Sequence, residues 1–146
     1  MALQRYQETV SKKSVKALMD AQTLQEGVHA YFSITARAVA GLDQPSGCMF
    51  VCVAIPVAKL LPKVGAVVEE SLQMGRERMT AYFKAELEKA GMAAGFNIPA
   101  AVSLQQDLFI AMSTQGRLGA SLEQLEQHAA RNAELVMLEG SRGLTK

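Results

Sequence analysis

Two cysteines four residues apart are the first candidates for chemistry. Cys48 and Cys52 are the only cysteines in the chain, and on a helix this spacing places both thiols on one face. On a strand they would lie about 13 Å apart, too far for a disulfide. A zinc site needs two further ligands, and a hairpin turning at 41–47 would not bring His29 near the thiols. We therefore interpret both thiols as small buried hydrophobic groups and predict no metal site.

The second histidine, His128, lies in a polar stretch of a predicted helix. Gln124 and Asn132 stand four residues to either side of it, and Glu126 faces another direction. The chain therefore has no Glu-x-x-His pair of the kind that holds a di-iron centre. We interpret His128 as a surface residue.

The acidic residues do not form a catalytic pattern either. Glu69 and Glu70, and the pair Glu86 and Glu88, lie among basic residues on the polar side of a predicted helix. General acid–base catalysis uses a carboxylate whose pKa is shifted by burial in a pocket. The chain contains neither G-x-x-x-x-G-K-[ST] nor G-x-G-x-x-G after a strand, the two glycine motifs that bind phosphate groups. We predict no enzyme, no catalytic residue and no cofactor.

If the chain were an enzyme, its candidate functional residues would be the polar ones that interrupt an apolar segment. These are His29, Tyr31 and Arg37. Their simpler interpretation is the solvent side of a strand or helix.

Composition indicates one folded domain over residues 1–146. The chain is 49% hydrophobic and 20% charged, with a net charge of +1, so it has no strong field to attract nucleic acid. A basic N-terminal stretch has only Tyr6 as an interleaved aromatic, which does not suit nucleic-acid binding. We predict no nucleic-acid partner.

The N-terminal segment does not read as a secretion signal, because residues 1–22 lack an apolar core of the required length. The two thiols suit a reducing compartment. We expect a cytoplasmic protein, with membrane association or export without a cleaved signal as the alternative.

The apolar stretch Cys48–Val68 is the most costly part of the chain to leave in water. Its only charges are Lys59 and Lys63, and Pro56 and Pro62 interrupt it. Two lysines near the centre of a bilayer would each cost about 2.5–3.5 kcal/mol, which disfavours a membrane-spanning helix. We expect the other helices to cover this segment.

The N-terminal third gives one firm element and one ambiguous one. Residues 2–26 predict a helix that ends at Gly27. Residues 28–38 alternate apolar and polar as in a strand, so a β-hairpin over about 28–55 is one interpretation. The other is a helix over 28–40, which we favour because an isolated hairpin is marginally stable and no third strand follows.

The rest of the chain predicts helices. Pro56 and Pro62 each suit a first helical turn or a kink, because neither can donate to the helix hydrogen bonds. Helices are expected over 63–90, 99–113 and 122–139, with an interruption at 115–119. Ser121 and Gln124 form a capping box, and Gly140 is the expected stop.

These elements predict a mainly α fold: a small bundle of three to five amphipathic helices around an apolar central segment. The expected function is non-enzymatic protein interaction or assembly, with self-association into a homo-oligomer or a larger complex through apolar helix faces. The alternative is a membrane-active protein, holin-like, translocator-like or pore-forming in behaviour, that inserts residues 28–68. The residues predicted to make the interaction are apolar ones from the middle of the chain: Phe50, Val53, Ile55, Leu60, Leu61, Val68, Leu72, Met79 and Phe83.

Overall fold

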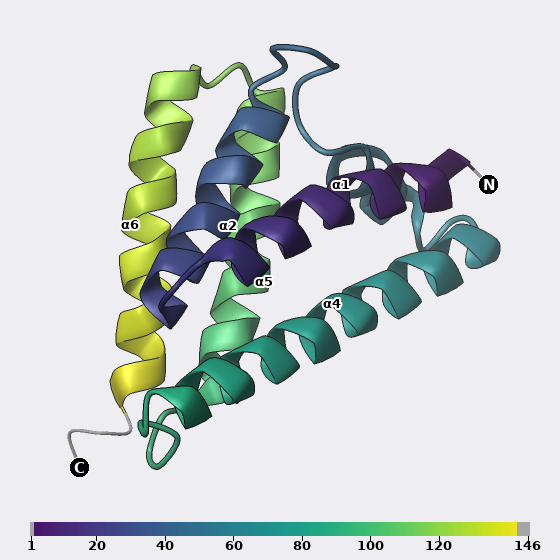
Figure 1. Cartoon of the computed structure of the whole chain (residues 1–146). Coiled ribbons are helices and arrows are strands. Elements are labelled where there is room, and N and C mark those ends of the chain that lie inside the picture. The colour runs from purple at the N-terminus through teal and green to yellow at the C-terminus, as the bar shows by residue number, and fades with distance from the viewer. Residues whose placement is uncertain (1, 143–146) are drawn as a thin grey trace.

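The protein folds into helices joined by short loops (Figure 1). The computed structural model describes residues 2–142, and among these the side chains of all but 2–4, 7 and 9–11. No strand occurs within this range, so the predicted mainly α fold is confirmed. The helices are α1 (Ala2–Asp20), α2 (Leu24–Val39), the π-helical turn η1 (Phe50–Ala54), α3 (Ile55–Val57), α4 (Pro62–Lys89), α5 (Ile98–Arg117) and α6 (Leu122–Ser141).

Helix α2 is the centre of the packing. It contacts α1, α5 and α6, while α4 packs on α5 (Figure 1). Val28, Phe32 and Ala36 are completely buried, and their spacing of four residues places them on one helical face. The predicted organisation around Cys48–Val68 is therefore only partly correct, because the chain's own core is built on α2.

The first helix ends earlier than predicted, and Gly27 does not stop it. The Thr23 hydroxyl accepts a hydrogen bond from the Glu26 backbone N–H (3.2 Å), and the Glu26 carboxylate accepts one from the Gln22 N–H (3.0 Å). This cap starts α2, because it satisfies N–H groups that the first helical turn leaves open. Gly27 lies inside α2, where a Cβ would collide with the Tyr82 hydroxyl.

The hairpin alternative over 28–55 is wrong. Residues 24–39 are helical, and the favoured helix of 28–40 is confirmed to within one residue at its end. The 41–47 turn does form, with Gly41 and Gly47 at positive φ and the Gly47 N–H bonded to the Val39 carbonyl (2.8 Å). It leads into the π-helical turn η1, not into a second strand.

The apolar stretch 48–68 is covered only in part. Phe50 and Val51 on η1 are buried, as is Val68 on α4, whereas Leu60 and Leu61 in the turn before α4 are exposed. Pro56 and Pro62 occupy first helical turns, as predicted. No helix in the described part of the chain has the length and apolarity needed to cross a membrane.

The C-terminal helices match their predicted ranges, with two extensions. Helix α5 runs on to Arg117, so the interruption predicted at 115–119 begins only at Leu118. Gly116 faces the main chain of α2, where a Cβ would collide with the Val39 carbonyl oxygen. Helix α6 begins at the predicted capping box of Ser121 and Gln124. It continues through Gly140, against which the ring of Phe96 packs.

Candidate ligand-binding pocket

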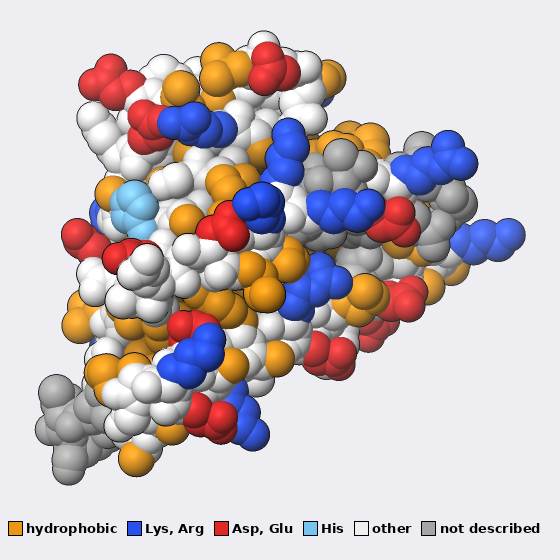
Figure 2. All heavy atoms as spheres, viewed as in Figure 1, with side chains coloured by type: hydrophobic (Ala, Val, Ile, Leu, Met, Phe, Trp, Pro, Cys, Tyr) orange, Lys and Arg blue, Asp and Glu red, His pale blue; other side chains and the backbone are white. Residues whose placement is uncertain are grey.

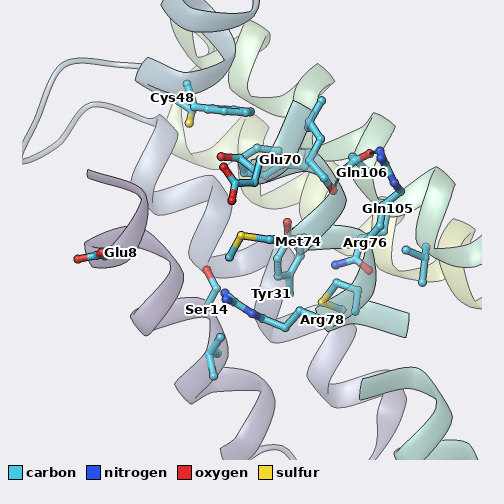
Figure 3. Close-up of a pocket in the computed structure, with 18 of the residues that line it drawn as sticks. Glu8, Ser14, Tyr31, Cys48, Glu70, Met74, Arg76, Arg78, Gln105 and Gln106 are labelled. Atoms are coloured by element: carbon cyan, nitrogen blue, oxygen red, sulfur yellow. Dashed lines mark hydrogen bonds between the residues drawn. The ribbon is translucent and has the colours of Figure 1, made fainter. Parts of the chain in front are cut away.

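A pocket of about 540 Å³ lies between α1, α2, α4 and α5, with η1 contributing a wall (Figure 3). Its origin is in the packing of the two outer helices. Helix α1 rests on α2 and α4 rests on α5, and within the described residues α1 and α4 do not pack closely along their lengths. The space between α1 and α4 therefore stays open, and α2 and α5 close it on one side.

The surface of the pocket is mostly apolar, and its apolar residues come from separate elements. The floor includes the buried side chains of Leu18 on α1, Phe50 on η1, Met79 on α4 and Val102 on α5. Figure 2 shows hydrophobic side chains, together with a basic side chain, between α1 and α4. An apolar concavity of this size is typical of sites for small molecules.

Charged residues line the pocket at its rim. Glu8, Glu70 and Arg78 are exposed to solvent. Arg76 is half-buried, and its guanidinium donates hydrogen bonds to the side-chain oxygens of Gln106 (2.8 Å) and Gln73 (2.8 Å). Among the charged residues of the described lining, Arg76 alone is half-buried, and both of these hydrogen-bond acceptors are neutral amides.

Gln105 is the exceptional polar residue of the interior. Its side chain is 1% exposed, yet neither the amide oxygen nor the amide nitrogen has a hydrogen-bond partner. The adjacent Gln106, by contrast, also donates to the Leu72 carbonyl (3.1 Å). In Figure 3 Gln105 converges with Tyr31 and Met74 on the same space. A buried amide without a partner costs about 1–3 kcal/mol of stability.

Two tyrosines add neutral polar groups to the wall. Burial raises the pKa of the Tyr31 hydroxyl. The nearby Gln105 amide lowers that pKa in part. Neither the nitrogen nor the oxygen of this amide meets the geometry of a hydrogen bond. Burial, followed by the neighbouring Cys48, raises the pKa of Tyr6 to about 12. Both phenols are therefore protonated at neutral pH.

The residues predicted to make the interaction separate into three groups. Phe50, Leu72 and Met79 line the pocket. Val68 and Phe83 are buried in the chain's own core, and Ile55 is half-buried against it. The most exposed are Leu60 at 78%, Val53 at 56% and Leu61 at 52%.

Sequence reasoning missed Gln105, although the chain contains a signal for it. Val102, Gln105, Phe109 and Met112 follow helical spacing on α5, so Gln105 is a polar residue on an otherwise apolar stripe. Of the three polar residues that the sequence offers as enzyme candidates, Tyr31 lines the pocket, whereas His29 and Arg37 lie on other faces of α2 and do not.

The cysteines and histidines do not meet in one site. Cys48 lines the pocket, while the half-buried Cys52 thiol lies 3.7 Å from the Ser113 carbonyl oxygen, to which it donates. His29 contacts Ser33, and His128 contacts Gln115 on α5. Within residues 2–142 no group of three or more His, Cys, Asp or Glu side chains is arranged to hold a metal ion.

Comparison with protein-family models, with curated proteins and with solved structures finds no match for this chain.

Proposed function

We propose that this protein is a non-enzymatic binding protein whose pocket between α1, α2, α4 and α5 takes a small, largely apolar molecule. The observation that carries the proposal is a 540 Å³ cavity with an apolar floor and a buried, unpartnered amide. Pockets of about 300–1,000 Å³ with a few placed polar groups are typical of such sites.

Binding is favoured over catalysis by the positions of the ionisable groups. General acid–base chemistry needs a titratable side chain within hydrogen-bond reach of the reacting atoms. The acids that line the pocket, Glu8 and Glu70, are exposed at its rim, and neither histidine belongs to its lining. The free thiols of Cys48 and Cys52 support our placing the protein in the cytoplasm.

Pocket filling tests this proposal. Gly75 on α4 lines the pocket, and a Cβ there would meet only the Gln106 amide nitrogen, at an ordinary 3.8 Å. Gly75→Phe therefore places a ring in the cavity, whereas Gly75→Ala adds one methyl group. Binding is measured by fluorescence titration with N-phenyl-naphthylamine, an uncharged apolar dye.

We expect saturable binding of one dye to the native chain and to Gly75→Ala. The Gly75→Phe variant should weaken it by about tenfold or more, which corresponds to the loss of about 1.4 kcal/mol of contact. Circular dichroism confirms that the variants remain helical. Equal dye binding by all three proteins, or none by the native chain, would contradict the proposal.

Self-association is the second candidate, and the exposed apolar side chains near the α3–α4 turn favour it. Val53, Leu60 and Leu61 are each more than half exposed. Burying each such side chain contributes about 1.5–3 kcal/mol. We propose that a second copy of the chain buries them. The same surface, flanked by Lys59 and Lys63, is what a membrane-active protein would insert first.

Light scattering after size-exclusion chromatography tests this second candidate. We expect the mass to rise with concentration for the native chain, and a Leu60→Gln/Leu61→Gln variant to remain monomeric. Leu118→Gln is the matched control, because Leu118 is equally exposed but lies after α5. A native chain that is monomeric at every concentration rules out self-association. Flotation with phosphatidylcholine–phosphatidylglycerol vesicles then tests the membrane alternative.

A further inference from the structure

We infer that the pocket selects an uncharged ligand with a hydrogen-bond donor and acceptor side by side, as in a carboxamide or a lactam, on an apolar body. This inference rests on the proposed ligand binding and adds the chemical class of the ligand. It is carried by the Gln105 amide and by the distribution of charge around the pocket.

The Gln105 amide offers a matched pair of bonds to such a ligand. Its nitrogen donates and its oxygen accepts, and both atoms are buried without partners. A ligand amide presents the complementary pair, so two parallel hydrogen bonds form and neither molecule keeps an unpaired buried group. Because an unmade buried hydrogen bond is costly, a ligand that lacks either atom gains less.

A charged ligand is disfavoured by the same surroundings. Glu8, Glu70 and Arg78 are exposed to solvent, whereas Gln105 is buried. Arg76, the half-buried cation of the lining, already donates to Gln106 and Gln73. A carboxylate or ammonium group at Gln105 would lose its hydration, and the neutral amide there offers it no counter-charge.

Access to Gln105 requires its side chain to turn, because both amide atoms are closed to solvent in the structure. The side-chain torsions of glutamine have several staggered minima and the terminal one is broad, so we expect the amide to turn toward the adjoining cavity when a ligand enters. Tyr31 and Met74, which converge with Gln105 in Figure 3, form the adjoining surface. Their ring and thioether suit the apolar body of the ligand.

Three isosteric probes test the inference by calorimetry and by displacement of the dye. Para-phenylbenzamide has both donor and acceptor, para-phenylacetophenone has the acceptor alone, and para-phenylbenzoate is an anion. On the native chain we expect the amide to bind about tenfold more tightly than the ketone, with the benzoate weakest.

Gln105→Leu supplies the decisive comparison, and Gln105→Met serves as a second variant of similar shape. In both we expect the preference for amide over ketone to fall about tenfold. The double comparison isolates the amide contact, because other differences between the probes cancel. A preference unchanged in these variants overturns the inference.

Failure of the inference and failure of the proposed function give different results. If the dye and all three probes bind the native chain without an amide preference, the pocket binds ligands but Gln105 does not select them. If neither dye nor probe binds, the proposed function fails and the inference fails with it.

Discussion

At the scale of single residues, the distinctive feature is a buried glutamine on an apolar helical stripe. Helix α5 presents Val102, Gln105 and Met112 inward, and the amide of Gln105 interrupts this surface without a bonding partner. Burying such a group lowers stability, and proteins tolerate this cost mainly at functional positions. Gln106 shows the usual solution, since it bonds to Arg76 and to the main chain of α4.

The two glutamines are expected to respond in opposite ways to replacement by leucine. Gln105→Leu removes two unpartnered atoms and keeps the shape, so the free energy of unfolding should rise by about 1–2 kcal/mol. Gln106→Leu removes one acceptor of the Arg76 guanidinium and one donor to the Leu72 carbonyl, and should lower the free energy of unfolding by about 1–2 kcal/mol. Urea denaturation of the ligand-free proteins measures both. Destabilisation by Gln105→Leu would show that its amide is satisfied in solution.

The buried phenols predict a loss of stability at alkaline pH. Burial, then Cys48, raises the pKa of Tyr6 from 10.0 to about 12 in the folded chain, so the folded state holds this proton more tightly than the unfolded one. Its contribution is complete below about 10 and is lost as the pH rises from there through about 12. Tyr31 acts in the same direction.

Tyr6→Phe should therefore lose less stability than the native chain across that interval, as measured by urea midpoints at stepped pH. Ionisation of lysines affects both proteins equally, so the difference between the two curves reports the phenol. Parallel curves for the native chain and Tyr6→Phe would contradict the assignment.

At the scale of elements, the helices that the sequence predicts well are those fixed by local signals. The capping box of Ser121 and Gln124, and the prolines at the starts of α3 and α4, act within one turn of chain. The boundary between α1 and α2 was misplaced because Gly27 resembles a helix stop. Its role is tertiary, since it admits the Tyr82 hydroxyl against α2.

Two glycines within helices should therefore behave differently when changed to alanine. At Gly75 the new methyl group has room, and loss of glycine's backbone freedom should stabilise α4 by about 0.5–1 kcal/mol. At Gly116 the methyl group would collide with the Val39 carbonyl, forcing α2 and α5 apart and costing about 1–3 kcal/mol. Thermal unfolding of the two variants checks the pair. A Gly116→Ala protein as stable as the native chain would show that α2 and α5 do not approach this closely.

At the scale of the whole molecule, the pocket arises from helix placement that sequence patterns do not encode. Phe50, Leu72 and Met79 were predicted as apolar contact residues and do share one surface, but that surface is a cavity wall. Helical periodicity identifies which face of an element is apolar. It does not show that α1 and α4 rest on different inner helices and leave a space between them.

The same limit of helical periodicity applies to the apolar segment 48–68. Composition identified 48–68 as the segment that most needs cover, and η1 is indeed largely buried. The turn that follows α3 carries Leu60 and Leu61 into solvent, because Pro62 begins a new helix directed away from it.

Methyl NMR of methionine-labelled protein tests the central claim, that the pocket binds a small apolar ligand, most directly. Met74 and Met79 line the cavity, whereas Met19 and Met92 are exposed elsewhere and serve as internal controls. On titration with para-phenylbenzamide we predict that the Met74 and Met79 resonances shift together and saturate at one ligand per chain, while those of Met19 and Met92 stay in place. Unmoved Met74 and Met79 resonances, or equal shifts at all four methionines, would contradict the account.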